Sequence, residues 1–501
     1  MAEVIKEIEK AITGQYPIIY LNSTEERRIT TLLQQLAKDQ PGNMPVISWA
    51  CTSGLDIDGA NEETKNPVKA LQLIIEEAKP GFYILKDLLD YVGQPEFNRL
   101  LRDGYEKFRE RNDLFIFIVS PDKTIPHALS NEIFQIDVGL PSLEEMLTHI
   151  REFQKKEGTR KLRDAALTDI ALSLCGLTLN DATHVMHQIN HCEKITTTAV
   201  SGLINECKKR LVTSGGATCL EYAPVDFDID QVGGLGRLKE WISIRKKLFT
   251  HKAQLDGMPI PRGILIMGIS GCGKSMCAKV VAKTWNVPLF RLDMNLIFSQ
   301  MHGSPEAAFH KVTQTVESAA PAVLWIDEIE NGLGLLEGGN INQSHVFSAF
   351  LTWMQEKPPL VFVAATANQI ESLPAELIRK GRFDQVFFCD LPDDEEREEI
   401  LKIHLKSNKQ NPDNFNIAHL TKITQGWNAA EIEQAVNGGR IDANSQEHEF
   451  TTIDITQHMD TIVPLSETMK EQIKKIKDWA WDRATPASKG KGRELSFNEE
   501  G

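Results

Sequence analysis

The residues best suited to chemistry form one glycine-rich run, Gly268-Ile269-Ser270-Gly271-Cys272-Gly273-Lys274-Ser275. An apolar stretch precedes the run and a helical pattern follows it, which is the context in which the spacing G-x-x-x-x-G-K-S surrounds phosphates. The glycines let successive backbone N–H groups face a polyphosphate, and the helix N-terminus adds partial positive charge. Lys274 is expected to reach the outer phosphates, and the Ser275 hydroxyl to ligate Mg²⁺. The segment through Met276 is therefore predicted to bind the polyphosphate of a nucleotide.

Two carboxylates and an amide follow later apolar strands. Asp327 and Glu328 come directly after Val323–Ile326, and the carboxyl ends of buried parallel strands border the phosphate crevice. Asp327 is expected to hold Mg²⁺, and Glu328 to orient and polarise an attacking water. Asn368 follows the strand Leu360–Thr366, where an amide can hydrogen-bond that water or the γ-phosphate.

Two arginines form the third group suited to phosphate chemistry. Arg379 and Arg382 lie three residues apart beside Gly381, so both can project from one end of a short helix. A guanidinium matches phosphate oxygens bidentately and stabilises the charge that develops in phosphoryl transfer. Taken alone, a pair of surface arginines would be read as solvated.

Composition narrows the class of protein. The chain has 501 residues, 55 Lys plus Arg and 70 Asp plus Glu, for a net charge of −15, with 41% apolar and 25% charged residues. This is typical of a folded protein and disfavours a nucleic-acid partner, because phosphate neutralisation needs clustered cations. The N-terminus does not resemble a signal peptide, and no apolar run approaches the roughly 18 residues that cross a bilayer. We expect a soluble, cytoplasmic protein without membrane insertion.

None of the eight cysteines forms a C-x-x-C pair, and none has a histidine at zinc spacing. They are read as reduced thiols of an intracellular protein. For Cys272 alone we consider the hypothesis that the following helix N-terminus lowers its pKa and makes it sensitive to oxidation.

The elements that must position these residues alternate between short apolar runs and helical patterns, which indicates parallel sheets crossed over by helices. This order occurs twice. Pro141 and Pro392 each end a strand and precede an acidic helix start, 251 residues apart, and Gly176 and Gly426 begin similar segments 250 residues apart. A register held over such distances indicates an internal duplication.

The first half lacks the phosphate motif. After the strand Tyr16–Leu21 the chain continues as Asn22-Ser23-Thr24-Glu25-Glu26-Arg27-Arg28, without a glycine or a Gly-Lys pair. Carboxylates at that place would repel phosphate. Lys86-Asp87 ends the apolar run Phe82–Leu85, where a lone Asp is usually a cap or turn residue. If the first half is a nucleotide-binding fold, it has lost its nucleotide.

Taken in order, these motifs resemble an AAA ATPase module over about residues 225–445. The resemblance rests on Gly233-Gly234-Leu235, Gly257–Gly263, the glycine-rich run, the Asp-Glu strand, Ala367-Asn368 and Arg379–Asp384. One branch of the family, the AAA proteins of cyanobacteria and plastids known as a hypothetical plastid reading frame, is more similar still. That similarity lies in Trp325–Glu330, Phe350–Lys357 and Leu377–Asp384, and also in Tyr16–Arg28 and Val463–Ser466.

The resemblance implies a fold and a division of the chain. The fold class is α/β: a P-loop NTPase parallel sheet with a C-terminal helical lid, preceded by a degenerate AAA-like α/β domain. The expected segments are 1–212, the degenerate nucleotide-free domain with its own helical lid; 213–230, a linker; 231–392, the large ATPase subdomain; 393–465, the lid; 466–484, a C-terminal helix; and 485–501, a disordered tail.

The resemblance also implies further site residues. Arg379 and Arg382 match arginine fingers that act on a neighbouring subunit of a ring, expected to be a hexamer, and Asn368 matches a sensor residue. The nucleotide pocket is expected to include Gly233, His404, Gly426, Ala429 and Ala430, with the departure that Asn428-Ala429 stands where Ser-Gly is usual. The pore loop corresponds to Met301, His302 and Gly303 and lacks the usual aromatic residue, which argues against processive threading.

The sequence thus predicts a Mg²⁺-dependent ATPase that forms a homo-oligomer and remodels an unidentified protein partner, in the cytoplasm or in a plastid stroma. Two alternatives stay open: an ATP-gated assembly scaffold with slow turnover, and an AAA motor stimulated by nucleic acid. A P-loop small-molecule kinase is the weakest option, because it would not need Asn368, Arg379 and Arg382 in this arrangement.

Overall fold

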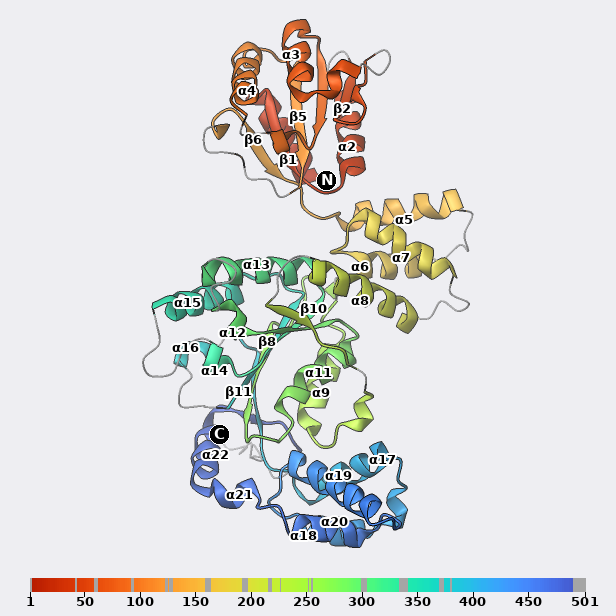
Figure 1. Cartoon of the computed structure of the whole chain (residues 1–501), viewed down its shortest axis with the longest axis vertical. Coiled ribbons are helices and arrows are strands. Elements are labelled where there is room, and N and C mark those ends of the chain that lie inside the picture. Colours follow the sequence, from red (N-terminus) through yellow and green to blue (C-terminus); the bar gives the residue numbers. More distant parts are fainter. Residues whose placement is uncertain are drawn as a thin grey trace, which may run out of the picture. The chain divides into compact units, whose positions relative to one another are not determined.

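The protein forms two compact units, residues 1–190 and 191–501, which are described separately. The structure is a computed structural model (Figure 1). It describes residues 2–40, 43–57, 62–91, 94–121, 125, 129–157, 164–191, 197–214, 219–225, 227–250, 252–253, 256–298, 304–332, 341–368, 374–378 and 381–489. Among these residues, no helix combines the length and the apolar character needed to cross a membrane.

A six-stranded sheet in the order β3-β2-β4-β5-β1-β6 forms the centre of the N-terminal unit. All neighbouring strands are parallel except β2 and β3. Both faces of the sheet are buried, because alternate side chains of the same strands enter two separate apolar clusters. The strands are β1 (Ile18–Asn22), β2 (Val46–Ala50), β3 (Gly54–Leu55), β4 (Gly81–Lys86), β5 (Leu114–Ser120) and β6 (Phe134–Asp137).

Helices cover this sheet on both faces. Apolar residues of α1 and α2 pack on one face and those of α3 and α4 on the other. A further helical segment, α5–α7, follows β6. The helices are α1 (Ala2–Thr13), α2 (Glu26–Asp39), α3 (Pro67–Glu77), α4 (Pro95–Phe108), α5 (Leu143–Glu157), α6 (Asp164–Leu174) and α7 (Leu179–His191).

The C-terminal unit contains a seven-stranded sheet in the order β13-β12-β8-β11-β10-β9-β7. Its neighbours are parallel except for β7, which pairs antiparallel with β9. The strands are β7 (Leu220–Tyr222), β8 (Gly263–Gly268), β9 (Leu289–Leu292), β10 (Ala322–Ile326), β11 (Val361–Ala367), β12 (Gln385–Cys389) and β13 (Thr485–Pro486).

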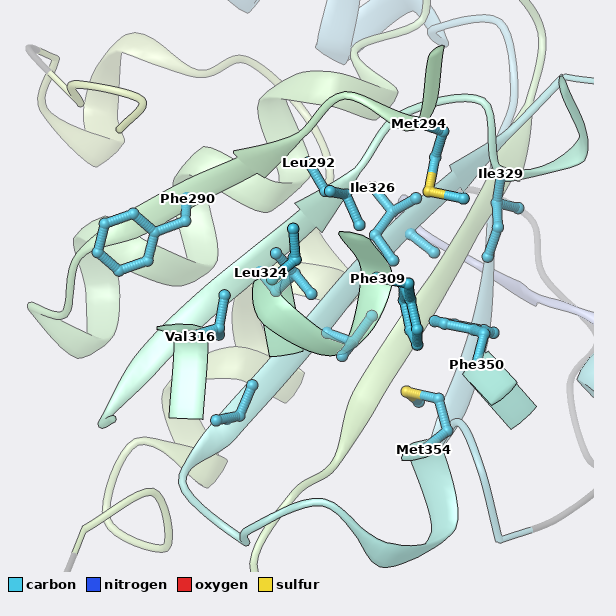
Figure 2. Close-up of a cluster of buried hydrophobic side chains, with 14 of the residues drawn as sticks. Phe290, Leu292, Met294, Phe309, Val316, Leu324, Ile326, Ile329, Phe350 and Met354 are labelled. Atoms are coloured by element: carbon cyan, nitrogen blue, oxygen red, sulfur yellow. The ribbon is translucent and has the colours of Figure 1, made fainter. Parts of the chain in front are cut away.

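The core on one face of this sheet fixes the strand that carries the two carboxylates. Leu324 and Ile326 of β10 lie with Phe309, Phe350 and side chains of β9 in one cluster of buried apolar residues (Figure 2). On the other face the sheet packs against α9 and α11. Burial of alternate β10 side chains on opposite faces explains the continuous apolar run that ends at Asp327.

The helices of this unit surround the sheet and then continue as a helical group after β12. Those near the sheet are α8 (Thr197–Ser214), α9 (Gly236–Arg245), α11 (Lys274–Trp285), α12 (Met294–Ile297), α13 (Pro305–Ser318), α14 (Ile329–Gly332), α15 (Ile341–Glu356) and α16 (Ala375–Ile378). The following helices are α17 (Asp394–Ser407), α18 (Ile417–Ile423), α19 (Ala429–Ser445), α20 (Thr452–Met459), α21 (Leu465–Thr468) and α22 (Lys470–Arg483).

The predicted fold class is confirmed: two α/β parts with parallel-dominated sheets, the second followed by a helical region. The two sheets also share one strand order. Five strands correspond, with β2-β4-β5-β1-β6 matching β9-β10-β11-β8-β12. The antiparallel edge strands do not correspond, because β3 follows β2 in the chain whereas β7 precedes β8, and β13 is an addition. This shared topology supports the internal duplication.

Two predicted boundaries differ from the structure. The interval 213–230, expected to be a linker, contributes β7 to the second sheet, and α8, expected to end the first domain, falls in the second unit. The tail expected to be disordered from Thr485 begins instead with β13, paired with β12, and Ala487 is fully buried. Its backbone exchanges hydrogen bonds with Phe388 and Arg237, so main-chain pairing outweighs the polar composition. Residues 490–501 lie outside the described part of the chain.

Candidate active site

The glycine-rich run forms the turn between β8 and α11, and its backbone requires glycine. Gly271 and Gly273 have φ values of 78° and 83°, in the left-handed region that glycine adopts without a steric cost. A side chain at Gly268 would meet the Cys389 carbonyl oxygen at 2.1 Å, and one at Gly271 would meet Asn428 at 2.7 Å. The glycines therefore permit both the turn and the close approach of two neighbouring segments.

Lys274 opens α11 and is about nine-tenths buried. Its Nζ donates to the carbonyl oxygens of Gly268 and Ile269, each at 3.0 Å, so the ammonium lies inside the turn. Burial lowers the pKa of Lys274, while nearby Cys389, Cys272, Glu330 and Asp327 act in the opposite direction. The turn thus holds a desolvated cation where the motif predicts phosphate.

Asp327 lies at the carboxyl end of β10 and faces Ser275 of α11. The Ser275 hydroxyl and the Asp327 carboxylate are 3.5 Å apart, and Thr366 donates to the same Asp327 oxygen at 2.6 Å. A serine hydroxyl beside a carboxylate is the oxygen-rich set that Mg²⁺ prefers. The residues present therefore fit the predicted Mg²⁺, and its coordination by Ser275 and Asp327 stays a prediction.

Glu328 is held in an unusual backbone conformation beside Asn368. Its φ is 48°, which costs a non-glycine residue about 1–2 kcal/mol. Its N–H donates to the Thr366 hydroxyl at 3.0 Å, and the Asn368 amide donates to its carboxylate at 2.7 Å. These contacts aim the carboxylate and the amide at each other across the ends of β10 and β11.

The structure therefore brings together five predicted residues from separate parts of the chain: Lys274, Ser275, Asp327, Glu328 and Asn368. It also adds residues that the sequence analysis did not single out. Thr366 joins Asp327 to Glu328, Glu330 is buried and accepts the Asn368 N–H at 2.7 Å, and Arg291 lies 3.7 Å from Asp327. In the sequence, Glu330 was marked only as a further carboxylate after Glu328, and Thr366 only as a hydroxyl inside an apolar strand.

An open pocket lies beside these groups. It is lined by Asp327, Glu328 and the segment Arg291–Asn295 at the end of β9. Arg291 also lies over the Trp325 ring, with its guanidinium carbon 5.1 Å from the ring centre. The pocket opens at the carboxyl ends of the strands, where ligands of open α/β sheets bind.

Thr366→Val is expected to lower the rate of ATP hydrolysis about 10-fold while leaving ATP affinity within about threefold, because the valine keeps the shape and removes both hydrogen bonds. Steady-state turnover and equilibrium nucleotide binding, measured together, would separate the two effects. Thr352→Val, on the exposed side of α15, is the matched control. Equal losses in affinity and rate would contradict a positioning role for Thr366.

The helical group after β12 reaches the glycine-rich turn through the start of α19. Asn428 caps this helix, exchanging hydrogen bonds of 2.8 Å with Glu431, and the Ala430 N–H donates to the Gly271 carbonyl at 3.2 Å. Asn at the cap position supplies a side-chain acceptor as the usual Ser would, which accounts for Asn428 but not for Ala429 in the departure from the AAA pattern. Ala429 is the first residue of the helix.

The other predicted pocket residues lie on neighbouring elements. A side chain at Gly233 would meet Ile400 of α17 at 2.7 Å, and Gly426, with φ 83°, lies beside Ser466. His404 is half-buried on α17, where burial lowers its pKa against the opposing effect of Glu433. Their contact with a nucleotide stays a prediction.

Of the predicted arginine fingers one is placed by the structure, and the predicted pore residues lie wholly outside its described part. Arg379 and the pore residues Met301, His302 and Gly303 lie outside the described residues. Arg382 lies between α16 and β12, and its guanidinium donates to the Glu376 carbonyl. The structure therefore places one of the two predicted arginine fingers.

The hypothesis of a reactive Cys272 is wrong. Burial raises the pKa of the Cys272 thiol well above its ordinary value, and Lys274 offsets this only in part. Its side chain is buried among Ile269, Cys277 and Cys389 in the core on the α11 face of the sheet. Desolvation of the thiolate therefore outweighs the positive end of the helix.

Comparison with known proteins agrees with this geometry. Residues 264–391 match the ATPase family associated with various cellular activities (AAA), and residues 4–138 match the SpoVK-like AAA ATPase N-terminal domain. The chain is 34% identical to the AAA domain-containing protein ycf46 of Guillardia theta over 95% of this chain and 94% of that protein. It is also 34% identical to ycf46 of Pyropia yezoensis, over 96% and 99% of the two chains.

A more distant similarity is confined to part of the chain. The ATP-dependent zinc metalloprotease FtsH of Mycoplasmopsis synoviae is 34% identical over 37% of this chain and 29% of that protein. The near full-length match to ycf46, together with the matched AAA region that carries Lys274, Asp327 and Glu328, shows that the chain belongs to the AAA ATPases, among the ycf46 AAA domain-containing proteins.

Proposed function

We propose that the C-terminal unit converts ATP and water to ADP and phosphate with Mg²⁺, and that an oligomer of the chain uses this reaction to remodel a protein partner. The supporting observation is the continuous set of hydrogen bonds from Ser275 through Asp327 and Thr366 to Glu328 and Asn368. It connects the phosphate-binding turn with the group that would activate water, at the carboxyl ends of parallel strands.

Each residue has one role in this proposal. Lys274 and the N–H groups of the turn bind phosphate, and Ser275 and Asp327 hold Mg²⁺, which would neutralise phosphate charge. Glu328 accepts a proton from the attacking water, and Asn368 orients that water or the γ-phosphate. Arg379 and Arg382 stabilise the developing charge in a neighbouring subunit. Gly233, Met276, His404, Gly426, Ala429 and Ala430 complete the nucleotide pocket.

The action of an arginine on a neighbouring subunit requires an interface between two different faces of the subunit, and such interfaces form a ring when the rotation closes. The ring is proposed to be a hexamer. Arg382 suits this role because it lies on the short connection between α16 and β12. Its guanidinium donates to the Glu376 carbonyl, which is neutral, so this hydrogen bond does not cancel the positive charge.

Arg382→Ala is expected to lower turnover about 100-fold with nucleotide binding retained. Mixing it with Lys274→Ala subunits should restore activity, because about a quarter of the sites would then combine an intact Lys274 with a neighbour's Arg382. The measurement is turnover of the mixture against the mean of the separate variants. A mixture that contains the Lys274→Ala, Arg382→Ala double variant in place of Lys274→Ala is the control and should stay inactive. No recovery in the first mixture would contradict action in trans.

A variant that binds ATP but does not hydrolyse it distinguishes the remodelling proposal from the scaffold alternative. The absence of an aromatic residue at Met301-His302-Gly303 favours a scaffold, whereas the intact Glu328 favours turnover. Partner capture with Glu328→Gln, followed by assay of the partner's folding or assembly state, distinguishes them. Continued processing of the partner by Glu328→Gln would overturn the remodelling proposal in favour of the scaffold.

A protein partner is preferred to nucleic acid because the net charge of −15 opposes binding to phosphate backbones. ATPase stimulation by DNA or RNA at low salt would reverse this preference. We place the protein in the cytoplasm, or in the stroma if it is encoded in a plastid.

A further inference from the structure

The two units can be matched residue by residue through their sheet registers. Asp137 pairs with Asn22, and Phe388, 251 residues after Asp137, pairs with Met267. The match can be continued from β1 through β5 to β4, and from β8 through β11 to β10. Lys86 then has the register position of Asp327, and Asp87 has that of Glu328. The residues Asp87 and Glu328 share a left-handed backbone, with φ values of 52° and 48°, which supports the match independently.

At this position the N-terminal unit has no glycine-rich turn, and the charges on its helix and its strand are opposite to those of the C-terminal unit. Its connection between β1 and α2 has three residues, Ser23–Glu25, whereas β8 and α11 are joined by the five residues Ile269–Gly273. Glu26 opens α2 as Lys274 opens α11, and it pairs with Lys86 at 2.8 Å. In the C-terminal unit the helix begins with the cation Lys274 and the strand is followed by the anion Asp327. In the N-terminal unit the anion Glu26 and the cation Lys86 stand at these two places.

A buried ion-pair network lies at the same end of α2 as this pair. Arg28 donates to both carboxylate oxygens of Glu145, at 3.0 and 3.2 Å, and to Glu25 at 3.1 Å. A further hydrogen bond of 2.7 Å goes to the Gly139 carbonyl. The Arg28, Glu25 and Glu145 side chains are 4%, 6% and 10% exposed, so the network is shielded from water. A buried guanidinium with these partners is well satisfied.

The network also joins the sheet to the helical segment α5–α7. Glu145 belongs to α5, and the second oxygen of Glu25 accepts the N–H of Leu179, the first residue of α7, at 2.6 Å. In the C-terminal unit the corresponding helix start, Ala429, lies 250 residues later, and its neighbour Ala430 donates to the phosphate-binding turn. Equivalent helices therefore meet equivalent turns, through a carboxylate in one unit and a glycine carbonyl in the other.

We propose that Arg28, held between Glu25 and Glu145, is an internal substitute for a nucleotide in the N-terminal unit. It clamps α5 and α7 onto the start of α2, so this unit stays closed at every nucleotide concentration and ATP acts on the C-terminal unit alone. The comparison with a bound nucleotide rests on the function proposed above, whereas the clamp itself rests only on contacts within residues 1–190.

Hydrogen exchange of the full chain tests the clamp. Arg28→Met should speed exchange of the first amides of α7 on the order of 100-fold, because it removes the guanidinium that Glu25 and Glu145 share and that links α2 to α5 and α7. Exchange in α17 and α19 should stay unchanged and serves as the internal reference. Arg27→Met, one residue earlier and exposed, is the matched control. Unchanged exchange of α7 in Arg28→Met would overturn the proposal.

A milder variant decides the case in which Arg28→Met does not fold. Glu25→Gln keeps the shape of the side chain and an acceptor for Leu179, while it removes the charge that faces Arg28. It should speed exchange at the start of α7 by about 10-fold. A folded Glu25→Gln chain with the exchange pattern of the wild type would equally overturn the clamp.

A second experiment measures how many nucleotides the chain binds, by equilibrium dialysis with Mg²⁺ and a slowly hydrolysed ATP analogue. The wild-type chain should bind one nucleotide, and Lys274→Ala should keep only the residual binding of its impaired C-terminal site, about 1000-fold weaker. The exchange of α7 should be the same with and without the analogue. Binding of one nucleotide to Lys274→Ala with an affinity near that of the wild type, or protection of α7 by the analogue, would overturn the inference. If the wild-type chain bound none, the function proposed for the C-terminal unit would fail, while the exchange of Arg28→Met would still decide the clamp.

Discussion

Glu328→Gln is expected to lower ATP turnover by about 1000-fold while nucleotide binding persists. Glutamine keeps the length of the side chain and an oxygen that can accept the Asn368 amide hydrogen bond, now 2.7 Å long, but it cannot take a proton from water. The effect should therefore appear in the chemical step alone. Phosphate release under saturating ATP, measured beside nucleotide affinity, is the direct comparison.

The control is Glu395→Gln, an exposed carboxylate in the first turn of α17, which should leave turnover within about twofold. Asn368→Ala is informative beside it, because it leaves the Glu328 carboxylate intact and removes only the amide that orients it. If Glu328→Gln retained wild-type turnover, another group would have to serve as the base, and Asp327 and Glu330 would be the candidates within reach.

Most of this site could be predicted because its residues belong to short contiguous patterns. Lys274 and Ser275 follow from the glycine spacing, and Asp327 and Glu328 from a buried strand that ends in two acids. Thr366 could not be predicted, since it reads as part of an apolar strand and its partner Asp327 is 39 residues away. The register between β10 and β11 decides which hydroxyl meets which carboxylate, and no local pattern carries it.

The fold, like the site, could be predicted where short local patterns determine it but not where distant segments pair. The alternation of strands and helices predicted two α/β parts, and the 251-residue spacing predicted that they correspond. The strand β13 was missed because Thr485 and Pro486 have no strand pattern of their own and pair with β12 about a hundred residues earlier. That the first part binds no nucleotide stays a prediction from its carboxylates and its missing Gly-Lys pair. The opposite placement of charge, with Glu26 on the helix and Lys86 on the strand, could be recognised only from the three-dimensional register.

Lys274→Ala is expected to weaken Mg²⁺–ATP binding by about 1000-fold, and hydrolysis should disappear with it. The ammonium already lies nine-tenths buried in the turn, so its desolvation has occurred before phosphate arrives, and phosphate can replace the carbonyls of Gly268 and Ile269 as its partners. Lys279→Ala, on the following turn of α11, is the matched control and should leave affinity within about twofold. Fluorescent-nucleotide titration measures both.

The pH dependence of binding gives a second test of the same contact. Burial lowers the pKa of Lys274 in the free site, and a bound polyphosphate favours the charged form and so raises that pKa. Binding therefore takes up a proton at alkaline pH, and affinity should fall as the pH rises past the pKa of the free site. Lys274→Ala removes this titration, so its weak residual binding should lose that slope. An alkaline slope that persisted in Lys274→Ala would show that another group takes up the proton on binding, and it would contradict the role of Lys274 as the cation that meets the phosphates.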